Sequence, residues 1–181
     1  MKHILFILLV ATVVTSCKKS DSGNPTPDPG TGTGNVPEKV TGQWLYGTFA
    51  MADFWAYDGT YLGNPFSLSV AFDFKTDGTY EMYYSSEAND YGCRSDAFSY
   101  FKGNVDFKDD SSFILYPKEG NFRGFYNCTP QYNFNRPALS SELAVDTLYY
   151  TFETDEYGKE WMVVRFDPND EYGSYFDKTT W

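Results

Sequence analysis

The sequence predicts an all-β protein folded as an eight-stranded antiparallel up-and-down barrel. Aromatic residues make up 20% of the chain, and Phe and Tyr favour strands because their rings pack well on a pleated surface. Several segments alternate apolar and polar residues with a period of two, as half-buried strands do, and short turns join most of them. Eight such strands close into a barrel without an exposed edge, although a two-sheet β-sandwich gives the same strand pattern.

The first 16 residues predict a secretory signal peptide, in which a short basic start precedes an apolar run over residues 4–14. A helix needs about 20 apolar residues to span a bilayer, so this shorter run is typical of a signal peptide. Residues 17–38 are rich in Pro, Gly and Ser and predict a disordered tether, because they cannot bury enough apolar surface to fold. Residues 39–181 then form a single folded domain.

The stretch Val14-Thr15-Ser16-Cys17 resembles a bacterial lipobox. The resemblance implies cleavage before Cys17, lipidation of its sulfur and attachment to a membrane through the acyl chains. An Asp directly after the lipidated Cys would resemble an inner-membrane retention signal. In this sequence the residue at that position is Lys18. We therefore expect an outer-membrane lipoprotein, at the periplasmic face or at the cell surface. An ordinary signal peptide followed by an incidental Cys is the alternative.

Eight strands are expected in the folded domain, and the clearest pair is the hairpin around Thr76-Asp77-Gly78. Val70, Phe72 and Phe74 alternate with polar or small residues before this turn, and Gly78 supplies the positive φ that a tight hairpin needs. The expected strands cover residues 41–50, 67–75, 79–85, 97–107, 112–116, 122–128, 147–154 and 160–166.

The connections between these strands include three longer segments. Residues 51–65 form an aromatic-rich loop that either covers a cavity or packs its rings on the core, and residues 86–96 form a polar loop. Residues 129–146 are the longest irregular segment, with a short helix expected over residues 138–144. The tail over residues 167–181 either adds an edge strand or packs across the bottom of the barrel.

The start of the folded domain resembles the opening motif of the lipocalins. The residues are Lys39-Val40-Thr41-Gly42-Gln43-Trp44, with Gly-x-Trp in the first strand, and residues 72–80 look like a strand-turn-strand of lipocalin-like lipoproteins from Gram-negative bacteria. The resemblance implies a binding barrel in which Trp44 closes one end and Arg165 packs over its ring by a cation–π contact. The second lipocalin motif, Thr-Asp-Tyr, is absent from its expected place, and the ligands of the family are diverse.

The charge and the histidine content exclude several classes of function. A net charge of −11 repels phosphate backbones, so no nucleic-acid partner is expected, and it favours a soluble monomer. The only histidine is His3, within the predicted signal peptide, which excludes catalysis by Ser-His-Asp or Cys-His and the usual zinc sites. We expect no enzyme activity, cofactor or metal. Carboxylate catalysis is the alternative, but no spacing singles out a pair among Glu81, Glu87, Glu119, Glu142 and Glu153.

Two acidic segments supply clustered oxygen atoms of the kind that calcium prefers. They are Asp109-Asp110 and residues 167–171, and neither has the spacing of an EF-hand loop. We interpret both as solvated turns. The thiols Cys93 and Cys128 are expected to form a disulfide, because an exported protein folds in an oxidising compartment. A reactive pair would normally be closer in sequence.

Inward-facing side chains are expected to line a pocket. Aromatic walls with a few hydroxyl groups suit a small apolar, amphipathic or glycan ligand. A solid aromatic core is the alternative, and the barrel would then act through its surface as an interaction, inhibitor or envelope-structural module. The candidate lining residues are Tyr80, Met82, Tyr84, Tyr100, Tyr150 and Phe152.

Overall fold

The computed structural model describes residues 35–60, 68–108 and 111–181. The predicted signal peptide, Cys17 and most of the tether lie outside the described residues. The described part contains nine strands, one α-helix and two short 3₁₀ turns. The elements are β1 (Gly42–Tyr46), α1 (Met51–Ala56), β2 (Ser69–Phe74), β3 (Thr79–Asp90), β4 (Cys93–Lys108), β5 (Ser112–Tyr126), β6 (Phe134–Pro137), β7 (Asp146–Thr154), β8 (Glu160–Arg165) and β9 (Ser174–Thr179), with 3₁₀ turns at Pro130–Tyr132 and Ser140–Glu142.

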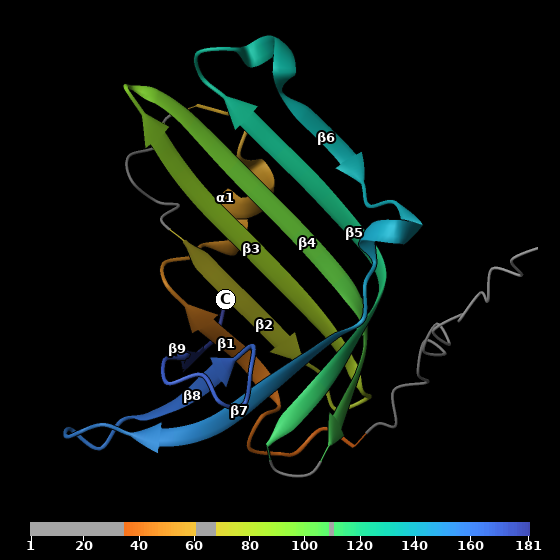
Figure 1. Ribbon diagram of the computed structural model, residues 1–181, viewed down its shortest axis with the longest axis vertical. Coiled ribbons are helices and arrows are strands. Elements are labelled where there is room, and N and C mark those ends of the chain that lie inside the picture. The colour runs from red at the N-terminus through yellow and green to blue at the C-terminus, as the bar shows by residue number, and fades with distance from the viewer. Residues whose placement is uncertain (1–34, 61–67, 109–110) are drawn as a thin grey trace, which may run out of the picture.

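All strand pairings are antiparallel, and the hydrogen bonds run in a ring over eight strands. The order is β4-β3-β2-β1-β9-β8-β7-β5, and β4 also pairs with β5, while β6 joins the far side of β5. Apart from β6, strands that follow one another in the chain lie next to each other in the ring. The predicted all-β class and the antiparallel order are therefore confirmed. Figure 1 shows β3, β4 and β5 extending well beyond the other strands, with β6 alongside the far part of β5.

The two strands predicted over residues 112–116 and 122–128 are one continuous strand, β5. The turn expected at Gly120-Asn121 is wrong, because Gly120 pairs directly with Phe101 of β4 within the ladder. A Cβ atom at Gly120 would lie 2.8 Å from the ring of Phe101. A glycine is therefore required here because the ring of Phe101 lies against its Cα, and not because the chain turns.

The polar loop predicted over residues 86–96 is also wrong. β3 continues to Asp90 and β4 begins at Cys93, so only Tyr91 and Gly92 connect them. Both residues have positive φ, 49° at Tyr91 and 83° at Gly92, and two such residues are characteristic of the tight type I′ hairpin turn.

One expectation was that the tail over residues 167–181 adds an edge strand, and this expectation is wrong. β9 lies between β1 and β8, with Trp44 opposite Lys178 and Met162 opposite Phe176. It therefore completes the ring. Within the irregular segment of residues 129–146, the structure places β6, and the short helix expected over residues 138–144 is a single 3₁₀ turn, Ser140–Glu142.

Two separate clusters of buried apolar residues hold the sheet together. The first fills much of the ring interior and includes Trp44, Phe72, Phe113 and Met162. The second lies on the outer face, where α1 packs against β2, β3 and β4 through Phe54, which is fully buried among Ala71, Tyr83 and Phe98. The segment predicted as a loop over residues 51–65 is therefore helical over Met51–Ala56, and its described part packs on the core, as one of the two expectations states. Tyr61 lies outside the described residues.

Candidate binding cavity

One end of the ring is filled by aromatic side chains. Trp44 is 2% exposed, its indole N–H donates to the carbonyl of Val40 at 2.6 Å, and its ring lies 5.8 Å from that of Phe152. Gly42, two residues earlier, has a φ of 109°, a conformation that side-chain-bearing residues rarely adopt. The Gly-x-Trp pattern thus places a glycine at a position of positive φ at the start of β1 and a tryptophan in the core.

Two lysines, and not Arg165, cover this filled end. The ammonium group of Lys178 lies 5.2 Å from the ring centre of Trp44, and that of Lys39 lies 3.8 Å from the ring centre of Phe152. Arg165 is on the outer face, where it donates to Thr151 at 2.9 Å and to Glu153 at 3.0 Å. The cation–π contact that the resemblance assigns to Arg165 is therefore made by Lys178 in this structure.

The opposite end of the ring contains a cavity of about 440 Å³. Its deepest walls are buried apolar side chains, including Phe72, Leu115 and Phe176. Its mouth includes Leu68 and Phe166, which are 46% and 77% exposed. The lining residues are Tyr46, Leu68, Val70, Phe72, Tyr80, Met82, Tyr84, Phe101, Leu115, Pro117, Ala144, Asp146, Leu148, Val164, Phe166, Ser174 and Phe176.

Few polar groups accompany this apolar lining. They are the hydroxyls of Tyr46, Tyr80, Tyr84 and Ser174 and the carboxylate of Asp146. Burial, with a smaller contribution from the negative charge of Asp146, raises the pKa of the Tyr80 hydroxyl well above its ordinary value. Tyr80 therefore contributes to the cavity wall as an uncharged residue.

The structure divides the six predicted lining residues into three groups. Tyr80, Met82 and Tyr84, from β3, line the cavity. Tyr150 and Phe152 face the same interior but belong to the filled end, with ring centres 5.9 Å apart. Tyr100 lies on the outer face, where its ring is 5.0 Å from that of Tyr83. The lining residues that the sequence analysis missed come from the other seven strands of the ring and from the segments between them, because the register was needed to assign their faces.

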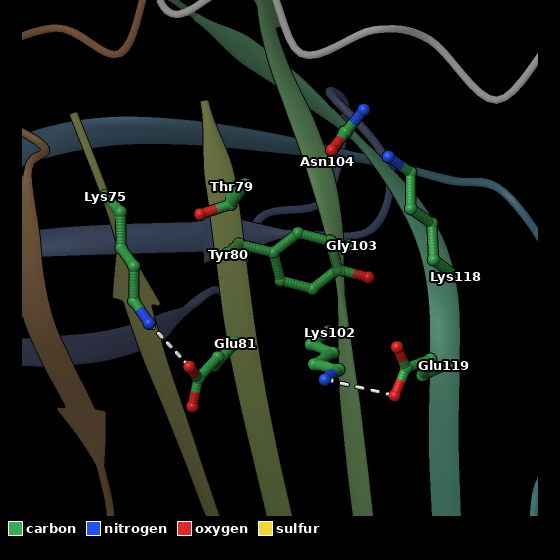
Figure 2. Close-up of a pocket in the computed structure, with 9 residues that line it drawn as sticks. All are labelled: Lys75, Thr79, Tyr80, Glu81, Lys102, Gly103, Asn104, Lys118 and Glu119. Carbon is green, nitrogen blue, oxygen red and sulfur yellow. Dashed lines mark hydrogen bonds and ion pairs between the residues drawn. The ribbon is translucent and has the colours of Figure 1, made fainter. Parts of the chain in front are cut away.

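A smaller, polar cleft of about 240 Å³ lies on the outer side of β2, β3, β4 and β5 (Figure 2). Lys75 pairs with Glu81 at 2.5 Å and Lys102 pairs with Glu119 at 3.0 Å. Two of the candidate catalytic carboxylates are thus each engaged by a lysine. Figure 2 shows the ring of Tyr80 beside this cleft, so Tyr80 borders both hollows.

A buried polar network, which the sequence analysis missed, fixes the segment after α1. Tyr57 donates to Asp96 at 2.6 Å, and Arg94 donates to the same carboxylate oxygen at 3.0 Å and to the Tyr57 hydroxyl at 2.9 Å. Arg123 donates to the carbonyl of Phe54 at 2.5 Å and lies over its ring at 4.8 Å. These contacts hold the helix to the sheet and lie away from the cavity.

The predicted disulfide is present. Cys93 and Cys128 are bonded, with Cα atoms 5.4 Å apart, and the bond joins the β3–β4 hairpin to the segment after β5. Beside it, the N–H of Arg94 donates to the side-chain oxygen of Asn127 at 2.7 Å.

The described residues contain no cluster of three or more His, Cys, Asp or Glu side chains suited to a metal ion. Asp167 and Asp170 accept hydrogen bonds from backbone N–H groups of their own turn, whereas Asp109 and Asp110 lie outside the described residues. Within the part of the chain that the structure describes, none of the helical segments has the length and apolar character needed to cross a membrane.

Comparisons with protein-family models, with curated proteins and with solved structures each found no match to this chain.

Proposed function

We propose that this chain is an exported, membrane-anchored lipoprotein whose lipocalin-like barrel binds a small apolar or amphipathic ligand. The observation that carries the proposal is the cavity of about 440 Å³ at one end of the ring. Pockets for small ligands typically measure about 300–1,000 Å³ and have mostly apolar walls with a few polar groups. The cavity between β3, β5 and β9 has this size and this chemistry.

The contrast between the two ends of the ring supports a binding role. At the filled end, the side chains of Trp44, Phe113 and Tyr150 are buried in one apolar cluster. At the other end the walls remain apolar and the space is open. A ligand of about 20 non-hydrogen atoms, at about −0.3 kcal/mol per atom, would bind with a dissociation constant of tens of micromolar.

The anchor and the export route rest on the sequence, with indirect support from the disulfide. Disulfides persist in oxidising compartments outside the cytoplasm, and the Cys93–Cys128 bond fits such a location. In the proposal, Cys17 carries the lipid and residues 18–38 hold the barrel clear of the membrane surface.

An interaction module is the second candidate, and a specific observation favours it. Tyr91, at the tip of the β3–β4 hairpin, is fully exposed, and Tyr172 is 84% exposed. Aromatic residues are enriched at protein interfaces, so a partner protein is the expected target if the cavity carries no ligand.

Native mass spectrometry of the chain purified gently from its own host tests the binding proposal. A reproducible added mass on the Cys17→Ala variant, which keeps the whole ring and the disulfide and carries no lipid, is the expected result. The variant Val70→Trp should lose that mass, because the larger ring occupies the cavity that Val70 lines.

The matched control is Val145→Trp, which adds the same bulk at an exposed position outside the lining. In Val70→Trp, steric overlap between the new ring and the ligand should weaken the binding free energy by about 1–3 kcal/mol. This loss corresponds to a reduction in affinity of at least about fivefold. Equal retention of the mass by both variants would refute binding in this cavity. An apo mass, together with failure of neutral apolar probes to bind the wild-type protein, would favour the interaction module.

A further inference from the structure

The charge pattern of the cavity points to a class of ligand. Asp146 is the only charged residue among the side chains that line it in the described part of the chain. We propose that the cavity selects apolar amines, with the ammonium group against Asp146 at the mouth and the apolar part between the buried walls. This inference rests on the proposed function, because it requires that the cavity binds a small ligand.

The position of Asp146 in the sheet separates the head of the ligand from its tail. Asp146 is the first residue of β7, pairs with Leu115 of β5 and shares the interior face with Leu148. Leu148 is buried whereas Asp146 is exposed. The carboxylate therefore lies at the mouth of the cavity, while the wall beneath it consists mostly of apolar side chains such as Leu148 and Leu115.

The basic groups near the cavity are directed elsewhere. Lys75 and Lys102 lie in the outer cleft, each paired with a glutamate, and Lys118 lines that same cleft (Figure 2). Arg165, on the neighbouring strand β8, is turned to the outer face and bonded to Glu153. Among the residues that the structure describes, a bound anion would therefore meet no cation in the lining.

The consequences for a ligand follow from simple electrostatics. A carboxylate headgroup would approach the like charge of Asp146 with its chain in apolar surroundings, which is unfavourable. An ammonium headgroup would gain a counter-ion at the same place. The net charge of −11 on the whole chain acts in the same direction.

Three probes with the same chain length test the proposal, namely decylamine, decanol and decanoate. Each is titrated against residues 18–181 at neutral pH, using displacement of the neutral fluorophore N-phenyl-1-naphthylamine. We expect the amine to bind about fivefold more tightly than the alcohol, equal to about 1 kcal/mol for a partly exposed ion pair. Decanoate should bind more weakly than both.

The variant Asp146→Asn should remove the advantage of the amine and leave the affinity for decanol within about twofold. Its control is Glu156→Gln, which removes the same unit of charge from an exposed turn between β7 and β8 and should keep the preference. Thermal melts of both variants establish that the ring is folded.

The outcomes separate the inference from the function on which it rests. Equal binding of the three probes, or a preference for the amine that survives in Asp146→Asn, overturns the inference and leaves the binding function in place. If neither the fluorophore nor any of the three probes binds the wild-type protein, the proposed function fails and the inference fails with it.

Discussion

Removing the Cys93–Cys128 disulfide should lower the free energy of unfolding by about 4 kcal/mol. The bond joins residues separated by 35 positions, and the chain-entropy relation gives about 4 kcal/mol for a loop of that length. Both cysteines are exposed, so replacing them with serine removes little buried surface. The hydrogen bonds between Arg94 and Asn127 hold the same segments together in the folded state. The effect should therefore arise mainly in the unfolded chain.

Urea unfolding of the Cys93→Ser, Cys128→Ser and double variants measures this effect. With a slope of about 2 kcal/mol per M, the midpoint should fall by about 2 M. Each single variant should match the double variant, because the bond is lost in all three. A midpoint shift below about 0.5 M would refute the entropic account, and so would a double variant much less stable than either single one.

The remaining predictions concern the outer cluster, the sheet, one surface ion pair and the anchor. Phe54→Ala should destabilise the fold by about 3–5 kcal/mol in urea unfolding, since it empties a fully buried site beneath α1. Gly103→Ala should cost about 1–3 kcal/mol by the same assay, because its Cβ would lie 2.0 Å from a backbone oxygen of β5. The hydrogen bonds from Arg136 lower the pKa of Glu142 to about 2. Glu142→Gln should therefore lower the melting temperature above pH 4.5, and the difference from the wild-type protein should vanish as the pH falls towards 2. Cys17→Ala should leave a soluble periplasmic protein by cell fractionation, and recovery of that variant with membranes would contradict the anchor.

The hairpin of β2 and β3 was predictable because one of its faces is apolar and its turn contains Gly78. The β3–β4 hairpin was not, because both strands extend beyond the filled ring and carry polar residues there. Both residues of the turn, Tyr91 and Gly92, have positive φ values. Only Gly92 is of a type that indicates such a turn in the sequence. Polar composition therefore suggested a loop where the backbone remains fully paired.

Face assignment failed for Tyr100 for a different physical reason. An alternating pattern identifies the apolar face of a strand only when the opposite face meets water. In β4, Tyr100 and Phe98 pack under α1 on the outer face, whereas Phe101 lines the cavity on the inner face. Because both faces carry aromatic residues, the register with β3 and β5 was needed to decide between them. The cavity itself could not be predicted, since it depends on how neighbouring side chains fill the space between strands.

The outer cluster also bears on why the ring can contain a cavity. A sealed empty space of 440 Å³ would cost on the order of 10 kcal/mol at about 24 cal/mol per Å³, which is comparable with the whole stability of a typical domain. The mouth at Leu68 and Phe166 opens the space to water and so avoids most of that cost. The packing of Phe54 against Tyr83 and Phe98 stabilises the outer faces of β3 and β4. The inner faces of these two strands border the cavity. The outer cluster therefore supplies buried contacts to β3 and β4 at the end of the ring where the interior is open.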